Sequence, residues 1–479
     1  MPIVSQDLLN FLPEICLIGT GCLLLLLEPF SPPSRKSWIG IFSVIGILAS
    51  AGATLFLWNR QTYFFHDLYI LDPYSLFFKL IFLGCALWVF LVSGRYIQLA
   101  GLPKGEYSAL VLFATAGMMV MSSGADLLSI YLGLEIMAIA SYALVGFLKK
   151  DRSSLEGALK YFLLGAFNSG IILYGIALLY GVLGGTHLSE ISAFLRLSDP
   201  FPKMFLIGMA LLVCGFAFKI AAFPFHMWAP DVYEGSPAPI AGFISVGSKT
   251  AAFAALIRIL FPSFSFLGLP WHRFFALLAI LTMTVGNLLA LHQENLKRML
   301  AYSSIAHAGY LLIGLAVGSL RGISGMLFYF VAYLTMNCGA FAMIVLLARK
   351  DKRPETIKDF EGMSKHHPVW SLCFLIFLLS LAGIPPTGGF TAKFYLFAAA
   401  IEGRYYFLAI FAVLNSVLAL AYYFRVVKAL YFTEGAGSEL SPSWGLRLSL
   451  ILLALLSLLV GLFPSPLLQT VQKASSALL

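Results

Sequence analysis

Charge is scarce in this chain of 479 residues. Only 11% of the residues are charged, whereas 60% are hydrophobic, and the mean hydropathy is +0.90. A water-soluble protein of this length needs more charge to cover its surface, so the composition excludes that class. Cysteine is scarce as well: the six cysteines are scattered through apolar stretches, and no two have the spacing of a metal-binding clip. We expect all six to be small packing residues.

Long apolar runs are what the chain has in place of charge. Runs of about 17 to 25 residues recur from end to end, and each can cross a bilayer core of roughly 30 Å. They lack the alternating pattern of barrel strands, and lipid tolerates only helices or closed barrels. The sequence therefore predicts an all-α polytopic membrane protein with about fourteen transmembrane helices. Their approximate bounds are 8–30, 38–58, 72–94, 106–122, 125–148, 155–184, 203–225, 237–258, 272–291, 300–318, 323–348, 368–388 with a continuation past Lys393, 404–430 and 445–463.

The net charge of +9 is unevenly divided between two sets of loops. The first run has no basic residue before it, so we interpret it as a retained span rather than a cleaved signal. Cytoplasmic loops are the more basic ones, which places the first set below in the cytoplasm and both termini outside. The charge is thus a topology signal, and we expect no nucleic-acid partner. The first set has 18 basic residues, Arg35, Lys36, Arg95, Lys104, Lys149, Lys150, Arg152, Lys297, Arg298, Arg349, Lys350, Lys352, Arg353, Lys358, Lys365, Arg425, Lys428 and Arg447, and the second has 8, Arg60, Arg196, Lys203, Arg258, Arg273, Arg321, Arg404 and Lys473.

Two of the predicted spans contain residues that interrupt a helix. In the seventh span, Lys219 precedes Pro224 by five residues. Proline removes a backbone donor and glycine weakens a helix, so each span is predicted to break near the middle of the membrane. A broken helix is tolerated in lipid only where the freed backbone is buried in protein or lines a cavity. In the twelfth span, Lys393 follows a cluster of helix breakers, Pro385, Pro386, Gly388 and Gly389.

The broken spans lie five apart in helix order, which predicts two five-helix repeats. Because five is odd, the second repeat would be inverted, and paired broken helices in inverted repeats are typical of transporters. The predicted organisation is peripheral helices 1 to 3 (1–105), a first repeat of helices 4 to 8 (106–262), a second repeat of helices 9 to 13 (263–432), and helix 14 with the C-terminal tail (433–479).

Ionisable residues inside the apolar runs are the candidate functional residues. Each one in the hydrocarbon core costs roughly 2.5–3.5 kcal/mol on insertion scales. A single buried lysine could serve only as a structural ion pair, and we interpret Lys79 in the third span in this way. The others indicate a proton path. They are Glu135, Lys160, Lys219, His226, Lys249 and Lys393, with His307, Glu156 and Lys297 as possible further relays.

Lysine suits a proton path because its charge is tunable. Burial favours the neutral amine, and a nearby carboxylate restores the ammonium form. Moving Glu135 towards or away from Lys219 would therefore load or release a proton, with Lys249 as a central relay and Lys393 as the outlet. The histidine of the tenth span and His226 would bridge the gaps, because imidazole both accepts and donates near neutral pH. The alternative for both histidines is a structural, hydrogen-bonded role.

One stretch imitates a nucleotide site. The run G-F-I-S-V-G-S-K-T from Gly242 resembles a phosphate-binding loop, but Ser248 separates its second glycine from Lys249, and the run lies in an apolar span. Nothing else in the chain resembles a flavin, haem, iron–sulfur or nicotinamide site. We expect no cofactor and no metal on this chain.

Three stretches resemble a known family. They read K-Y-F-L-L-G-A-F-N-S-G-I-I-L-Y-G from Lys160, F-K-I-A-A-F-P-F-H-M-W-A-P-D-V-Y-E-G from Phe218, and N-L-K-R-M-L-A-Y-S-S-I-A-H-A-G-Y from Asn295. They are similar to subunit N of the proton-pumping NADH–quinone oxidoreductase, respiratory complex I, and the resemblance covers nearly the whole chain. That family is one of three antiporter-like membrane subunits, related to subunits of multi-component sodium/proton antiporters. The L type has a long C-terminal extension that this chain lacks, and the M type carries glutamate where Lys393 stands.

The resemblance implies a function and a set of partners. It implies a proton-translocating subunit in a membrane arm that contains other antiporter-like subunits. Quinone, NADH, FMN and iron–sulfur clusters are then expected on partner subunits, and the expected location is the bacterial inner (plasma) membrane. The functional positions of the family match Glu135, Lys160, Lys219, His226, Lys249 and Lys393 of this sequence.

Two other classes of function stay open. A subunit of a multi-component cation/proton antiporter would share the lysine path, but a sodium carrier should hold more buried carboxylates than Glu135 alone. A non-conducting scaffold would gain nothing from the insertion cost of five buried lysines. The sequence therefore favours proton translocation within a quinone reductase.

Overall fold

A computed structural model of the chain describes residues 3–32, 36–197, 201–263, 269–348, 355–435 and 440–478. Arg35 and the basic stretch 349–354, which were assigned to cytoplasmic loops, lie outside the described residues. Within the described ranges the protein consists almost entirely of helices, with one two-stranded sheet.

Twelve helices of the described residues are long and apolar enough to cross a membrane. Two more spans are each split into two shorter helices, α9 (Lys203–Lys219) with α10 (Trp228–Gly235), and α18 (Pro368–Ala382) with α19 (Gly388–Glu402). Together they make the predicted fourteen spans, with the seventh and twelfth broken. The unbroken spans are α2 (Leu12–Leu27) continued by η1 (Glu28–Phe30), α3 (Trp38–Phe56), α4 (Pro73–Ala100), α5 (Lys104–Ser123), α6 (Leu127–Val145), α7 (Arg152–Leu183), α11 (Ala238–Phe243) continued by the π-helix η3 (Ile244–Ser248) and α12 (Lys249–Leu260), α14 (Leu269–Ala290), α15 (Leu296–Val317), α16 (Leu320–Leu347), α20 (Tyr406–Phe432) and α21 (Trp444–Leu462).

Short elements connect the spans, and the sequence patterns did not predict them. Strands β1 and β2 form an antiparallel hairpin in which Thr62 pairs with Leu71. The last helix, α22, is amphipathic and packs against α16 and α4, with Ser475 hydrogen-bonded to Ser324 (2.7 Å). These elements are α1 (Ile3–Asn10), β1 (Thr62–Phe64), β2 (Tyr69–Leu71), α8 (Leu188–Leu197), η4 (Phe261–Ser263), η5 (Ile357–Phe360), α17 (Met363–His366) and α22 (Ser465–Ser476).

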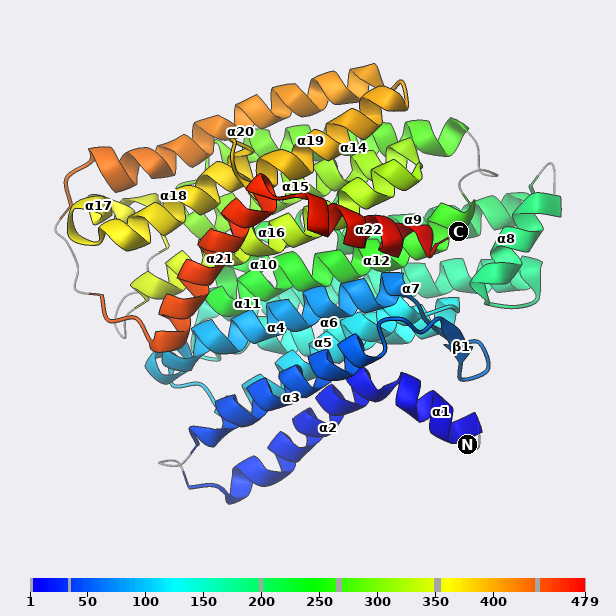
Figure 1. Cartoon of the computed structure of the whole chain (residues 1–479), viewed down its shortest axis with the longest axis horizontal. Helices are drawn as coiled ribbons and strands as arrows, with labels where there is room; N and C mark the ends of the chain where they lie inside the picture. The colour runs from blue at the N-terminus through cyan, green and yellow to red at the C-terminus, as the bar shows by residue number, and fades with distance from the viewer. Residues whose placement is uncertain are drawn as a thin grey trace.

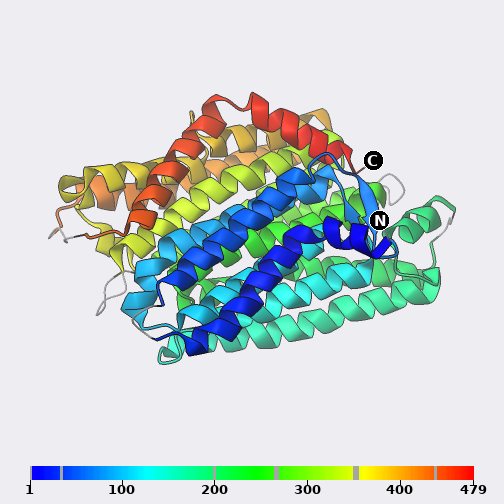
Figure 2. The ribbon, with the colours of Figure 1, turned by 60° about the horizontal axis from the view of Figure 1, so that its bottom comes forward.

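The spans lie side by side, so their ends form two opposite faces of the molecule (Figure 1). Both termini lie at the right-hand end in Figure 1, together with β1 and α8, whereas α17 lies at the other end. The two termini again lie at one end after the rotation in Figure 2. We call the end that carries them the terminal face, and the other end the opposite face.

Burial divides the bundle into a core and a periphery. The span made by α11, η3 and α12 is wholly buried, and α15 and α16 are nearly so. The helices α2, α3, α7, α20 and α21 are peripheral and expose apolar side chains such as Phe167 and Phe407, as contact with lipid requires. All six cysteines are free, but Cys22 is exposed on α2, so a packing role inside the bundle is wrong for that residue.

Glycines allow the closest helix contacts. A Cβ atom on Gly117 of α5 would lie 2.6 Å from the backbone nitrogen of Met137 on α6. A Cβ atom on Gly309 of α15 would lie 2.5 Å from the backbone nitrogen of Met283 on α14. Small residues bring membrane helices together because packing, and not water exclusion, drives their association. The two helix pairs occupy corresponding places in the two proposed repeats, whose boundaries stay a prediction.

Candidate proton path

The seventh span breaks directly after Lys219. Helix α9 ends at this residue, the backbone turns at Ala221 with a φ of 57°, and α10 begins at Trp228. The carbonyl of Phe218 accepts hydrogen bonds from the Ala221 amide (3.0 Å) and from the indole of Trp228 (2.9 Å). The end of α9 therefore keeps hydrogen-bond partners inside the protein, as a broken helix in a membrane needs. The break predicted from Pro224 is confirmed.

The predicted switch pair is not in direct contact. The Nζ atom of Lys219 donates to the hydroxyl of Tyr142 on α6 at 3.4 Å, and Lys219 is 1% exposed. Glu135 lies two turns earlier on α6, half-buried, and accepts a hydrogen bond from the hydroxyl of Ser169 on α7. Among the described residues no ion pair joins Glu135 to Lys219. Each member of the pair is held instead by a neutral hydroxyl.

Lys249 lies in the most buried span. It begins α12 directly after the π-helical turn η3, and it is 4% exposed. Its Nζ atom donates to Ser304 Oγ on α15 at 2.5 Å and lies 5.7 Å from the ring centre of Tyr233. The Ser304 hydroxyl donates in turn to the Tyr233 hydroxyl (3.3 Å). A π-helical turn frequently marks a functional site, and this one precedes the proposed relay.

His307 lies one turn beyond Ser304 on α15, 2% exposed. Its Nδ1 atom is 2.5 Å from the hydroxyl of Tyr329, and its Nε2 atom is 3.3 Å from the hydroxyl of Tyr423. The Tyr423 hydroxyl also shares a hydrogen bond with Ser303 (2.5 Å). The structure therefore places His307 in a buried cluster of hydroxyl groups, one turn along α15 from the partner of Lys249.

The twelfth span breaks between α18 and α19. Helix α18 ends at Ala382, and Gly383 has a φ of 85°, a conformation that glycine adopts without strain. The amide of Gly389 donates to Ser380 Oγ (3.1 Å), and a Cβ atom on Gly389 would lie 1.8 Å from the Ser380 carbonyl oxygen. Glycine at 389 thus lets the second half-helix begin against the first. The break predicted from the proline and glycine cluster is confirmed.

Lys393 points back across this break. Its Nζ atom donates to the carbonyls of Leu381 (3.2 Å) and Ala382 (3.0 Å) and to Ser416 Oγ on α20 (3.0 Å). A positive charge is favourable there, because the C-terminal end of a helix carries partial negative charge. The Nζ atom also lies 4.7 Å from the ring centre of Tyr310, whose helix, α15, carries His307. Lys393 therefore closes the gap in its own span.

Lys160 is not buried, which corrects the prediction. Its side chain is 42% exposed and forms ion pairs with Glu156 (2.7 Å) and with Asp231 on α10 (2.6 Å). Asp231 also pairs with Arg298 (2.7 Å), which pairs in turn with Glu234 (2.7 Å). The lysine lies only two turns inside the start of α7, so its long side chain reaches the polar end of the bundle. Glu156 belongs to the same network.

Asp231, Glu234 and Arg298 are residues that the sequence patterns missed as part of this network. Two features of the sequence could have indicated the network. The run from Phe218 has acidic residues near its end, and the run from Asn295 has a basic pair near its start. Lys297, a predicted relay, is 4% exposed and pairs with Glu355 (3.2 Å). It also donates to the carbonyls of Glu234 and Ser236. Lys297 thus joins α10 to the chain after α16.

His226 is buried at the break of the seventh span but takes no part in the chain of hydroxyl groups. Its ring stacks on Phe223 with centroids 5.7 Å apart. Its Nδ1 atom has no hydrogen-bond partner among the described residues. The structure brings His226 near the other proposed residues without connecting it to them.

Lys79 has a partner of its own. Its Nζ atom lies 2.8 Å from a carboxylate oxygen of Glu14 on α2, and both side chains are fully buried. The ion pair ties α4 to the first span. Sequence reasoning gave Lys79 a structural role but missed Glu14, because the two residues are far apart in the chain.

The three central lysines share one property that other buried cations lack. Lys219, Lys249 and Lys393 contact hydroxyl and carbonyl groups, and among the described residues none of them has a carboxylate within ion-pair distance. By contrast, Lys79 pairs with Glu14, and buried Arg258 pairs with a carboxylate on α4. The described residues hold no cluster of three or more His, Cys, Asp or Glu side chains that could hold a metal.

Fold and site together define a polytopic membrane protein of the transporter type, with two broken helices beside buried lysines. The chain belongs to the NADH:quinone oxidoreductase/Mrp antiporter transmembrane family, whose model matches residues 124–419.

Relatives and solved structures agree with this family. The chain is 45% identical to NADH-quinone oxidoreductase subunit N of Trichlorobacter lovleyi, over 97% of this chain and 96% of that one. It is 42% identical to subunit N of Moorella thermoacetica, over 94% of each chain. A chain of respiratory complex I from Thermus thermophilus matches with a TM-score of 0.81 at 32% identity, covering 95% of this chain and 98% of that chain. A chain of the Mrp complex from Dietzia sp. DQ12-45-1b, 21% identical, shares the fold with a TM-score of 0.86, over 100% of this chain and 98% of that one.

Proposed function

We propose that this chain is the proton-translocating membrane subunit of an NADH–quinone oxidoreductase. The relatives that it matches over nearly its whole length are named NADH-quinone oxidoreductase subunit N. Electron transfer from NADH to quinone would take place on partner subunits, which would carry the FMN and the iron–sulfur clusters. This chain would contribute the path along which protons cross the membrane.

The neutral surroundings of the three central lysines carry this proposal. A buried ammonium beside a carboxylate is held in its charged form, because losing the proton would leave an unpaired buried charge. Lys219, Lys249 and Lys393 have hydroxyl and carbonyl partners, which can hydrogen-bond a neutral amine as well as an ammonium. Their charge is therefore free to change during a cycle. That is the requirement for a lysine that relays protons.

The path would run through the middle of the bundle. Glu135 would control the charge of Lys219, since a carboxylate that approaches stabilises the ammonium form. Lys249 would relay the proton, and the hydroxyl cluster around His307 would connect it towards Lys393, the outlet. The network of Lys160, Glu156 and Lys297 would lie at the entrance, on the opposite face. His226 would act as a further relay when it gains a partner.

The proposed setting is the bacterial inner membrane, with other antiporter-like subunits of a membrane arm as neighbours. The solved chains that match are parts of multi-subunit membrane assemblies. The more basic loops favour an arrangement in which the opposite face is cytoplasmic and the terminal face is outside.

Replacing Lys219 by alanine tests the path. Lys219→Ala should assemble into the complex and oxidise NADH, but proton pumping in inverted membrane vesicles should fall several-fold. Lys203→Ala is the matched control, because Lys203 begins the same helix, α9, and is exposed. Unchanged pumping per NADH oxidised in Lys219→Ala would contradict the proposed path.

Purification distinguishes the proposed function from that of a cation/proton antiporter subunit. The tagged chain should bring down flavin-containing and iron–sulfur subunits from detergent-solubilised membranes. Recovery with antiporter subunits alone would favour the other class. The likeness to the Mrp chain concerns the fold, and the identities of 42–45% favour the quinone reductase.

A further inference from the structure

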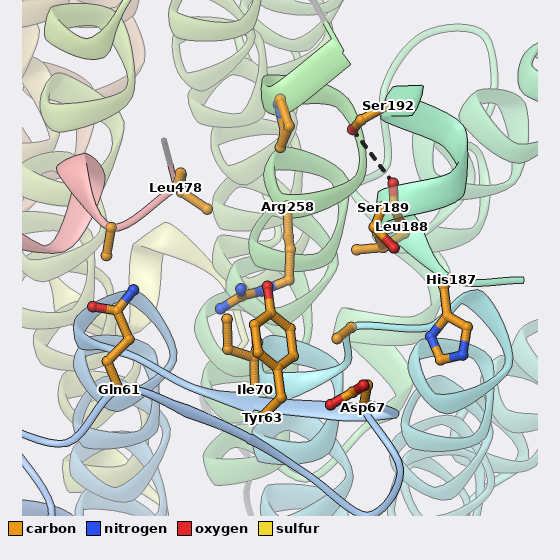
Figure 3. A pocket seen from close by; sticks show the side chains of 13 residues that line it. Gln61, Tyr63, Asp67, Ile70, His187, Leu188, Ser189, Ser192, Arg258 and Leu478 are labelled. Carbon is orange, nitrogen blue, oxygen red and sulfur yellow. Dashed lines mark hydrogen bonds between the residues drawn. The ribbon is translucent and has the colours of Figure 1, made fainter. Parts of the chain in front are cut away.

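A second buried ion pair lies below a cavity on the terminal face. The cavity has a volume of about 570 Å³, far above the roughly 10–15 Å³ that one water needs. It lies between the β1–β2 hairpin, α8 and the last residues of the chain. Figure 3 shows the side chain of Arg258 at the centre of the residues that line the cavity, with Tyr63 in front and Gln61 and His187 to either side.

Arg258 of α12 is held by the N-cap residue of α4 and by α5. Its Nη1 and Nη2 atoms donate to the two carboxylate oxygens of Asp72 at 2.9 and 3.0 Å, and its Nε atom donates to the carbonyl of Ser122 on α5 (3.0 Å). Asp72 is fully buried and caps α4 by accepting from the amide of Ser75. Arg258 is 6% exposed. The Arg258–Asp72 pair is therefore rigid and almost closed to solvent.

Below the pair, buried side chains of α4 and α12 lead to Lys249. The guanidinium lies 4.7 Å from the ring centre of Tyr74, whose hydroxyl donates to the carbonyl of Ala254 (2.8 Å). Lys249 is on the same helix as Arg258, nine residues earlier, which is about 14 Å at 1.5 Å per residue. The cavity thus approaches the proposed relay from the terminal face.

In a proton pump, a route from this cavity to Lys249 would allow passive back-flow. A proton that entered from the terminal face and reached Lys249 would dissipate the gradient that the pump had built. An arginine is suited to block that route, because a guanidinium has five N–H donors, has no acceptor and does not lose its proton in proteins. A chain of water molecules cannot hand a proton through such a group.

We propose that the Arg258–Asp72 pair is a seal that keeps protons in the terminal-face cavity from reaching Lys249. This inference rests on the proposed function, because a seal has a purpose only in a chain that moves protons. Asp72 holds the guanidinium at the cavity wall, and both of its carboxylate oxygens accept hydrogen bonds from it. Arg258 lines the cavity, whereas Lys79 and Glu14, the other buried pair, are not among the residues that line it.

Passive proton leak is the measurement that tests the seal. The whole complex is reconstituted in liposomes, an acid–base jump imposes a pH gradient without NADH, and the decay of that gradient is followed with a trapped dye. The variant Arg258→Gln/Asp72→Asn removes both charges and leaves no unpaired buried ion. It should let the gradient decay at least threefold faster than the wild type. The matched control is Lys79→Gln/Glu14→Gln, which removes the other buried pair and should decay at the wild-type rate.

A third substitution tests the route. Adding Lys249→Ala to Arg258→Gln/Asp72→Asn should bring the decay back towards the wild-type rate, because the leak would lose its relay. An assembled Arg258→Gln/Asp72→Asn complex that holds its gradient would overturn the seal and leave the pair a structural link. A leak that persists without Lys249 would overturn the route.

Arg258→Lys provides a second variant that keeps an ion pair with Asp72. A buried ammonium beside a carboxylate keeps its proton, so this complex should hold its gradient like the wild type, and a leak as fast as that of Arg258→Gln/Asp72→Asn would count against a seal made by the charged pair. Failure of the proposed function would look different: Lys249→Ala alone would then pump normally, whatever the leak of the Arg258 variants.

Discussion

Lys249 donates a hydrogen bond of 2.5 Å to Ser304, and this contact joins the centre of the first proposed repeat to the second. Lys249 begins α12, and Ser304 lies on α15, the tenth span. The hydroxyl also donates to Tyr233, so it is already part of a hydrogen-bond chain. A proton released by Lys249 has a polar group within reach on the side of the bundle that holds Lys393.

Lys249→Arg separates charge from proton transfer. Arginine preserves a positive group near Ser304 but stays protonated, so pumping should fall as severely as in Lys249→Ala, several-fold or more. The measurement is NADH-driven acidification of inverted vesicles, normalised to NADH oxidation with an artificial electron acceptor that reports assembled flavin subunits. Normal pumping in Lys249→Arg would show that Lys249 acts as a fixed charge and does not relay protons.

His307→Gln separates titration from hydrogen bonding. Glutamine has one donor and one acceptor, so it can keep bonds to Tyr329 and Tyr423, but it does not titrate. We expect normal assembly with slower proton pumping per NADH. If pumping is unchanged, the histidine is a structural hydrogen-bonding group, and the path from Lys249 to Lys393 passes through the hydroxyl groups alone.

Gly389→Ala should destabilise the broken twelfth span. The new Cβ atom would lie 1.8 Å from the carbonyl oxygen of Ser380, so the two half-helices must move apart. Overpacking of this kind costs about 1–3 kcal/mol or more, which should lower the midpoint of thermal unfolding of the purified complex. Gly52→Ala in α3 is the control, because a Cβ atom there meets nothing within 4 Å. Equal stability of the two variants would contradict the tight contact at Ser380.

Lys79→Gln alone should damage assembly more than Lys79→Gln with Glu14→Gln. The single change leaves a buried carboxylate unpaired, which costs about 3–5 kcal/mol, whereas the double change removes both charges. The amount of the chain in assembled complex, measured by native gel electrophoresis, checks this. A double variant that assembles no better than the single one would mean that the pair contributes more than charge neutralisation.

The sequence indicated the helical breaks well and the charge networks poorly. Proline and glycine act on their own backbone, so Pro224 and the cluster before Lys393 predicted both breaks. The burial of Lys160 was predicted wrongly. Its position on α7 does not reveal that its side chain forms ion pairs with Asp231 and Glu156 at the end of the bundle. The Arg258–Asp72 pair was missed for a related reason: Arg258 lies near the end of its predicted span and was assigned to a loop, whereas the structure buries it on α12.

By itself, the sequence determined the membrane class, the fourteen spans, the two broken helices and the lysines that lipid would otherwise exclude. These features follow from hydropathy and from local backbone chemistry, which neighbouring residues settle. Only the tertiary structure decided which charges are paired. Lys79 meets Glu14, and Arg258 meets Asp72, whereas Lys219, Lys249 and Lys393 meet hydroxyl and carbonyl groups. Whether a buried lysine keeps its proton or can release it depends on the groups around it. Those groups come from helices distant in the sequence, and helix packing determines which of them meet.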